Sequence, residues 1–310
     1  YITDREDVKM YGTSVSGSRI WTCVKSLCQE LEREMAKWKH CEYSLILVSG
    51  HATNVSFVGN FCGENDLILY DVLSHNSIEQ GCRLSKSDCK AFPHNDFRTL
   101  ENILKQNRES YEKILIIVEG VYSMDGDIAP IPSFVELKKA YGTFLMVDEA
   151  HSSCVLGKTG RGVDEHFELA PEDIDIGMGT LSKGLGSCGG YLAGKRSLIE
   201  YLRYNLPGFV FSVGIPPSSA AAALASIKLV QKDHSMIERL HSNIDFFLSE
   251  AHKRDYHTCL AKRTAIIPIM IGQEEAAFVL SKMLKEKGVC VPPAVYPAVP
   301  KGKARLRFCV

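Results

Sequence analysis

Short runs of aliphatic and β-branched residues alternate with longer amphipathic stretches between about residue 25 and residue 215. In the stretch 31–38 the apolar residues Leu31, Met35 and Trp38 recur three and four positions apart, which is the spacing of one helix face. Alternation of this kind is typical of strand-helix-strand units around a largely parallel sheet. The pattern therefore predicts an α/β fold.

The same pattern predicts where the individual elements lie. Strands are predicted at 44–49, 67–70, 114–119, 144–148, 174–179, 265–271 and 305–310. Helices are predicted at 31–38, 99–106, 132–141, 218–232, 237–253 and 274–287. Because long helices dominate after residue 216, we expect a large domain over 1–215 and a smaller domain over 216–310.

The composition excludes several classes of protein. Lys and Arg total 36 against 37 Asp and Glu, for a net charge of −1, and 45% of the residues are hydrophobic. This balance indicates a globular core and argues against disorder, a basic nucleic-acid-binding arm or an acidic tail. The most apolar stretches, 114–118 and 209–227, are too short for a bilayer or are interrupted by proline and serine, so no membrane span is expected.

The cysteines indicate a reducing compartment. There are eleven, an odd number, scattered without a CxxC pair, which favours reduced and mostly buried thiols in the cytoplasm. Tyr1–Arg5 contains no apolar core of a signal peptide. Since the chain starts without Met and stops within the predicted strand 305–310, we interpret it as a fragment or an excised module.

Two candidate chemical sites follow predicted strands in the second half of the large domain. Lys183 lies in Thr180-Leu-Ser-Lys-Gly-Leu-Gly, where its neighbours are too small to cover it. Asp148 ends a hydrophobic strand, and His151 follows three residues later. The carboxyl ends of parallel strands are where α/β sheets bind ligands. Taken singly, the lysine has an ordinary interpretation as a surface residue and the acid as a helix cap.

Three more sites complete a set. In Val48-Ser-Gly50-His51 a strand feeds a helix whose free N–H groups suit a phosphate. His75 lies in LSHNS, and Ser123 lies in the polar turn EGVYSMDGD. A phosphate anchor, a ring-nitrogen acid, a stacking histidine, partners for a phenolic oxygen and a Schiff-base lysine are together the requirements of pyridoxal phosphate (PLP).

These motifs also carry a family resemblance. Tyr11–Arg19 (YGTSVSGSR), LSHNS, EGVYSMDGD, VDEAHSSCVLGKTGRG, TLSKGLGSCGGY and VPKGKARLRF resemble the α-oxoamine synthases of PLP fold type I, over nearly the whole chain. The resemblance implies a mostly parallel seven-stranded sheet flanked by helices, a smaller C-terminal α+β domain and a homodimer. Family members carry more chain at both ends, which implies that both domains are incomplete here.

The resemblance assigns cofactor roles to individual residues. Lys183 matches the lysine that binds PLP covalently, and Asp148 matches the carboxylate that keeps the pyridine nitrogen protonated. His75 matches the histidine stacked on the ring. Ser123 and His151 match partners of the phenolic oxygen.

Further matches concern the phosphate and the substrate. Gly50, His51 and Thr180 match phosphate contacts, and Ser212 matches a segment that reaches the phosphate of the neighbouring subunit. Arg307 matches the guanidinium that binds the amino acid's carboxylate, for which a planar fork of donors is well suited. No metal site is expected.

The implied reaction condenses an amino acid with an acyl thioester and releases carbon dioxide to give an α-amino ketone. In it Lys183 removes the α-proton, and His75 hydrogen-bonds a developing charge. The segment 295–300 has valine and alanine where the biotin-pathway members have arginine and threonine, so the acyl group stays open. The segment Pro207–Gly214 is more similar to members that take an acyl carrier protein rather than CoA.

Other interpretations remain. Another fold-type-I activity, such as transamination or decarboxylation, shares Lys183 and Asp148, whereas a silent partner subunit of this family would lack the lysine. Asp148-Glu-Ala-His151 also spells a helicase motif, but Ser152 stands where the phosphate-binding loop needs glycine and the chain has no basic stripe. Cys154 and Cys188 are interpreted as core-packing residues rather than nucleophiles.

Overall fold

The structure is a computed structural model that describes residues 9–21 and 26–310. Tyr1–Arg5, considered above, and Cys23, one of the eleven cysteines, lie outside these ranges. None of the described helices combines the length and the apolar character that crossing a membrane requires.

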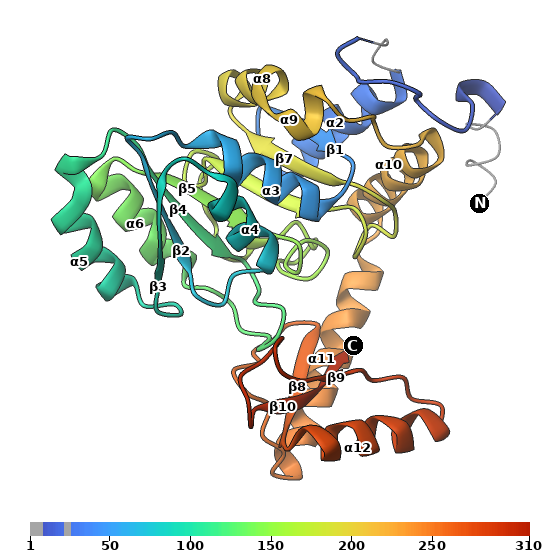
Figure 1. Ribbon diagram of the computed structural model, residues 1–310. Helices are drawn as coiled ribbons and strands as arrows, with labels where there is room; N and C mark the ends of the chain where they lie inside the picture. The colour runs from blue at the N-terminus through green and yellow to red at the C-terminus, as the bar shows by residue number, and fades with distance from the viewer. Residues whose placement is uncertain (1–8, 22–25) are drawn as a thin grey trace. The chain divides into compact units, whose positions relative to one another are not determined.

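The chain divides into two compact units (Figure 1). The first contains the described residues up to Gly120 together with Ala129–Asp233. The second contains Val121–Ile128 and His234–Val310. The domain boundary expected between residues 215 and 216 stays a prediction.

A seven-stranded sheet forms the core of the first unit, with the strand order β1-β7-β6-β5-β4-β2-β3. Its strands are β1 (Tyr43–Leu47), β2 (Leu67–Asp71), β3 (Asp88–Phe92), β4 (Ile114–Glu119), β5 (Phe144–Asp148), β6 (Ile176–Thr180) and β7 (Gly190–Gly194). β7 pairs antiparallel with β1 and β6, and the remaining neighbours pair in parallel. The predicted α/β class with a mostly parallel sheet is confirmed.

Helices cover both faces of this sheet. They are α2 (Ser26–Trp38), α3 (Gly50–Phe61), α4 (Asn76–Leu84), α5 (Phe97–Asn107), the 3-10 turn η1 (Arg108–Ser110), α6 (Ile131–Tyr141), α7 (Val163–His166), α8 (Arg196–Asn205), α9 (Pro207–Val210) and α10 (Pro217–Lys232). α3, α4 and α8 share one apolar core with the strands, and Figure 1 shows α5 and α6 on the opposite side of the sheet.

The central strands are apolar because both of their faces are covered. All six residues of β4 and the last four of β5 are buried, which is the continuous hydrophobic run typical of a parallel strand under helices. β4 and β5 occupy the predicted residues 114–119 and 144–148. Their carboxyl ends carry the acids Glu119 and Asp148, which pair with each other in the strand register.

The second unit is a small antiparallel sheet with helices. It contains α11 (Ser235–Lys253), β8 (Ile266–Gly272), α12 (Glu274–Glu286), β9 (Pro293–Ala294) and β10 (Ala304–Cys309), and its strand order is β8-β10-β9. The buried Arg305 fastens the segment Val121–Ile128 to this sheet, since its Nη1 lies 2.6 Å from Oδ1 of Asp125 and 3.1 Å from the carbonyl oxygen of Met124.

Candidate active site

A cavity of about 250 Å³ in the first unit brings most of the predicted site residues together. It lies where β5 and β6 end and α3 begins. Its lining residues are Ser49, Gly50, His51, Asn54, His75, Ser77, Glu119, Asp148, Ala150, His151, Met178, Thr180, Ser182 and Lys183. Seven of them are residues that the sequence predicts for the site: Gly50, His51, His75, Asp148, His151, Thr180 and Lys183.

Asp148 is the last residue of β5, and its carboxylate is buried. Oδ2 accepts a 2.8 Å hydrogen bond from Nδ2 of Asn54, and Oδ1 accepts a 2.9 Å hydrogen bond from the backbone N–H of Ala150. Nδ2 of Asn54 also lies 2.9 Å from Oγ of Ser77. The carboxylate is therefore fixed from both sides, and Asn54 is a site residue that the sequence analysis did not identify.

Lys183 and His151 meet at the mouth of the same cavity. Nζ of Lys183 lies 2.7 Å from Nε2 of His151. Lys183 follows β6, in a turn where the backbone N–H of Gly186 donates to the carbonyl oxygen of Lys183. The lysine is exposed, as its small neighbours predict, so its amine is accessible to a ligand in the cavity.

The amino end of α3 provides an anion-binding corner. Oγ of Ser49 caps the helix by accepting from the backbone N–H of Ala52 at 3.1 Å. A Cβ added to Gly50 would lie 3.0 Å from Cβ of Thr180, so glycine allows the helix end and the Thr180 hydroxyl to lie this close. Oγ1 of Thr180 lies 2.8 Å from Oγ of Ser182. Backbone N–H groups, hydroxyls and the helix dipole therefore converge here.

His75 precedes α4 as its N-cap, and its ring lies beside that of His51. Nδ1 of His75 lies 2.7 Å from Oγ of Ser77, and the two imidazole centroids are 6.3 Å apart in an edge-on arrangement. Burial lowers the pKa of His75 below its ordinary value, against the opposing effect of Asp148, and the charge of Lys183 lowers it further. The ring is therefore neutral at pH 7, which suits stacking on a cationic heterocycle.

Glu119 is a second buried acid that the sequence analysis did not assign. It ends β4, and it accepts a hydrogen bond from the backbone N–H of His75. Burial, together with the carboxylate of Asp148, raises the pKa of Glu119 well above its ordinary value. The signal was present in the sequence, because Glu119 ends a hydrophobic strand in the same way as Asp148.

Three predicted residues do not line this cavity. Ser123 and Arg307 belong to the second unit, where Nε of Arg307 donates to the carbonyl oxygen of Ser123 at 2.6 Å. Ser212 lies in the loop between α9 and α10, and its Oγ lies 3.4 Å from the carbonyl oxygen of Val213. Their roles toward the phenolic oxygen, the substrate carboxylate and the neighbouring phosphate stay predictions.

The two cysteines near the site differ from each other. Cys154 is buried, as predicted, and burial raises the pKa of its thiol to about 11. Cys188 is exposed, so the prediction that it packs in the core is wrong. Cys188 lies in a bend before β7, and it is exposed there although the next residue, Gly189, is buried.

The chemistry of these residues fits PLP. The capped end of α3, with Gly50 and Thr180, suits a phosphate dianion. Asp148 suits a pyridinium nitrogen, and the amine of Lys183 suits an aldehyde. Oδ1 of Asn54, buried beside Asp148 without a hydrogen-bond partner in the described structure, leaves a further polar atom available at the acidic end of the cavity.

Three comparisons agree with this fit. The family model for aminotransferase class I and II matches residues 25–310. The chain is 39% identical to an 8-amino-7-oxononanoate synthase of Thermoanaerobacter pseudethanolicus over 305 residues, covering 98% of this chain and 77% of the relative. It is 36% identical to a serine palmitoyltransferase of Bacteriovorax stolpii over 300 residues, covering 97% and 71%.

A solved structure extends the match to three dimensions. A serine palmitoyltransferase from S. paucimobilis, solved with bound PLP and myriocin, gives a TM-score of 0.95 at 29% identity, covering 100% of this chain and 77% of that one. Fold and cavity together define a PLP enzyme of fold type I. The chain belongs to the aminotransferase class I and II family and, within it, to the α-oxoamine synthases, which are PLP-dependent acyltransferases.

Proposed function

We propose that this chain condenses an amino acid with an acyl thioester, of CoA or of an acyl carrier protein, and releases thiol and carbon dioxide to give an α-amino ketone. One observation carries the proposal. A single cavity holds the exposed amine of Lys183, the buried carboxylate of Asp148 and the imidazole of His75.

Different residues bind different parts of the cofactor. Bound PLP supplies an electron sink for the α-carbon of an attached amino acid. Asp148, fixed by Asn54 and Ala150, keeps the proton on the ring nitrogen and so maintains that sink. The end of α3 at Gly50 and His51, with Thr180, binds the phosphate.

Lys183 is the proton carrier of the reaction. With PLP and an amino acid bound, the amine of Lys183 would take the α-proton and return a proton at the end. Nε2 of His151, 2.7 Å from Nζ of Lys183, holds the amine in place and is available to the phenolic oxygen. His75 stacks on the ring and hydrogen-bonds the thioester oxygen as negative charge develops.

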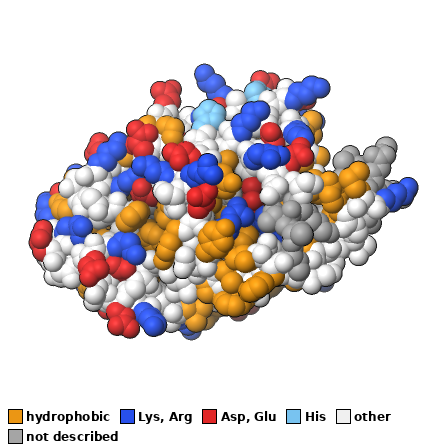
Figure 2. All heavy atoms as spheres, turned by 90° about the horizontal axis from the view of Figure 1, so that it is seen from above, with side chains coloured by type: hydrophobic (Ala, Val, Ile, Leu, Met, Phe, Trp, Pro, Cys, Tyr) orange, Lys and Arg blue, Asp and Glu red, His pale blue; other side chains and the backbone are white. Residues whose placement is uncertain are grey.

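The proposal extends to the remaining predicted residues. Arg307 binds the amino acid's carboxylate, Ser123 contacts the phenolic oxygen, and Ser212 contacts the phosphate of a second copy of the chain. A homodimer is supported by exposed apolar side chains beside Ser212: Phe211 is 86% exposed and Val213 is 52% exposed. Figure 2 shows patches of hydrophobic side chains on one face of the molecule. Such surfaces are typical of interfaces.

We place the enzyme in the cytoplasm. Nine cysteines of the described ranges are free thiols, which is the state that a reducing compartment maintains: Cys41, Cys62, Cys82, Cys89, Cys154, Cys188, Cys259, Cys290 and Cys309.

A mass-spectrometric screen tests the function. The chain loaded with PLP is incubated with single amino acids and with acyl-CoA or acyl-carrier thioesters, and products are sought whose mass is the sum of the amino acid and the acyl thioester less carbon dioxide and the released thiol. Lys183→Ala is expected to lower turnover by about 10³-fold or more, since it removes the proton-transferring group. A product that retains the amino-acid carboxylate, or an oxo acid from transamination, would contradict the proposal.

A further inference from the structure

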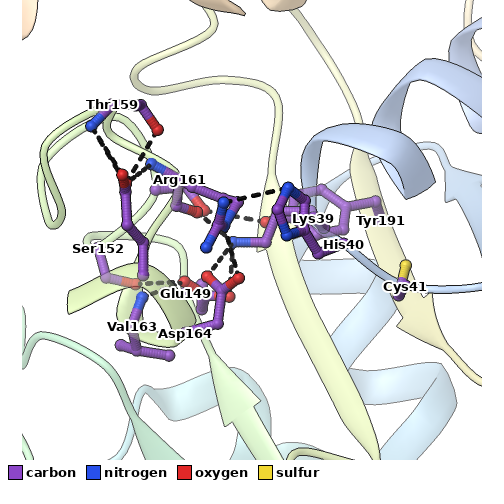
Figure 3. Close-up of polar contacts among 12 residues, drawn as sticks. Lys39, His40, Cys41, Glu149, Ser152, Thr159, Arg161, Val163, Asp164 and Tyr191 are labelled. Carbon is purple, nitrogen blue, oxygen red and sulfur yellow. Dashed lines mark hydrogen bonds and ion pairs between the residues drawn. The ribbon is translucent and has the colours of Figure 1, made fainter. Parts of the chain in front are cut away.

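Directly behind the turn that carries Asp148 and His151 lies a buried ion pair that the proposed reaction does not use (Figure 3). Lys39 follows α2, and its side chain is only 4% exposed. Nζ of Lys39 lies 2.7 Å from Oε1 of Glu149 and 3.9 Å from Oδ1 of Asp164, and it also donates to the carbonyl oxygen of Arg161.

Glu149 accepts hydrogen bonds from both ends of the loop that follows β5. Its Oε2 accepts from Oγ of Ser152 at 3.1 Å and from the backbone N–H of Val163 at 3.0 Å, as Figure 3 shows. Gly162, with a φ of +125°, passes so close that an added Cβ would overlap the Glu149 carboxylate. Glycine at position 162 therefore allows the loop to pass this close to the carboxylate.

Burial and pairing act on this ion pair in opposite directions. Burial raises the pKa of Glu149, and Lys39 lowers it only in part, so that the net shift is upward. For Lys39, burial lowers the pKa, but the carboxylates of Glu149 and Asp164 and the hydroxyl of Tyr191 outweigh it, so that the net shift is upward. Among the described residues Lys39 is the cation paired with Glu149, and removing one partner of a buried ion pair is costly because it leaves the other charge uncompensated.

Glu149 is covalently adjacent to Asp148 and lies two residues before His151, so its position sets theirs. We propose that Lys39 is a positioning residue for the cofactor site: by pairing with Glu149 it holds the turn 148–151 in the geometry in which Asp148 faces the ring nitrogen and His151 meets Lys183. This inference rests on the proposed binding of PLP. It also gives the glutamate of the Asp148-Glu-Ala-His151 motif a role unrelated to nucleotide hydrolysis.

A second ion pair, at the other end of β5, provides a matched control. Nζ of Lys138 lies 3.0 Å from Oδ2 of Asp175 and 2.6 Å from the carbonyl oxygen of Glu172. Oδ2 of Asp175 accepts from the backbone N–H of Leu145 at 2.8 Å. Lys138 therefore fastens the start of the strand, away from the cavity, as Lys39 fastens its end.

The test compares Lys39→Met, Lys39→Arg and Lys138→Met in the full chain. The readouts are the dissociation constant for PLP, the pH at which the absorbance of the lysine-bound cofactor changes, and the urea midpoint. Lys39→Met is expected to weaken PLP binding about tenfold, as loss of an outer partner does in metal sites, and to move the absorbance midpoint by about one pH unit. Lys39→Arg is expected to recover most of both.

Lys138→Met is expected to lower the urea midpoint. Its PLP affinity should stay within about twofold of wild type, and its absorbance midpoint should stay within about 0.2 pH unit. If Lys39→Met does not fold, Lys39→Met combined with Glu149→Gln carries the test, because it leaves no unpaired buried charge. Weaker PLP binding in that variant supports positioning, and wild-type affinity overturns it.

Two outcomes separate this inference from the proposed function. Equal changes in the Lys39→Met and Lys138→Met variants, in a wild-type chain that binds PLP normally, overturn only the positioning role. A wild-type chain that develops no cofactor absorbance overturns both.

Discussion

Glu119 offers a sharp test of the electrostatics of the cavity. Burial first, and then the carboxylate of Asp148, raise the pKa of Glu119 above its ordinary value of 4.5. At a pH between 4.5 and this raised pKa, the folded chain therefore holds a proton on Glu119 that the unfolded chain has lost. Stability therefore falls as pH rises through this window. In Glu119→Gln the amide oxygen still accepts from the N–H of His75, but the side chain does not titrate.

The expected magnitude follows from linkage. Below pH 4.5 the free energies of unfolding of wild type and Glu119→Gln should agree to within about 1 kcal/mol, since one neutral hydrogen-bonding group replaces another. Above pH 4.5 the free energy of unfolding of the wild type should fall by about 1.4 kcal/mol per pH unit relative to the variant, until the pH reaches the raised pKa of Glu119. The variant is then the more stable protein in mild alkali.

Urea unfolding of the cofactor-free chain at a series of pH values measures this difference. Glu250→Gln is a control of opposite sign, because hydrogen bonds from Lys253 and Arg254 lower the pKa of Glu250 to about 2, so its contribution is lost as pH falls. Parallel stability curves for wild type and Glu119→Gln would refute a protonated Glu119.

Two further predictions concern packing and reactivity. Gly81→Ala should cost about 1–3 kcal/mol in urea unfolding, because the new Cβ would lie 2.6 Å from Cβ of Val58, where α4 packs on α3. Gly63→Ala, with its nearest atom at 3.8 Å, should change stability by less than about 0.5 kcal/mol, and equal losses would contradict the contact. Iodoacetamide should modify the exposed Cys188 within minutes and spare the buried Cys154, whose pKa is about 11. Peptide mass mapping measures the two rates, and faster modification of Cys154 than of Cys188 would contradict this prediction.

The elements with the strongest local signal could be predicted from the sequence. β4 and β5 are unbroken hydrophobic runs, and α6 (Ile131–Tyr141) differs by one residue from the predicted helix because a proline opens it and Gly142 ends it with a φ of +59°. β3 and β7 were not predicted. β7 is Gly-Tyr-Leu-Ala-Gly, which has no β-branched residue, and it is a strand because β1 and β6 flank it on both sides.

Site residues that lie in a recognisable motif could be predicted from the sequence. Residues that contact the site from a distant part of the chain were much harder to predict. Lys183, Asp148, His75 and His151 stand out by residue type after a strand. Asn54 does not, because its contact with Asp148 spans 94 positions and depends on how α3 lies over β5.

The position of β7 between β1 and β6 also affects how the chain is made. Leu47 of β1 pairs with Gly190 of β7, so this apolar strand waits for its partner while roughly 140 further residues are added, about 7–30 s at ribosomal speed. Throughout that interval the nascent chain presents an unpaired hydrophobic edge. Because unpaired strand edges are prone to aggregate, this topology favours chaperone capture of β1 during translation.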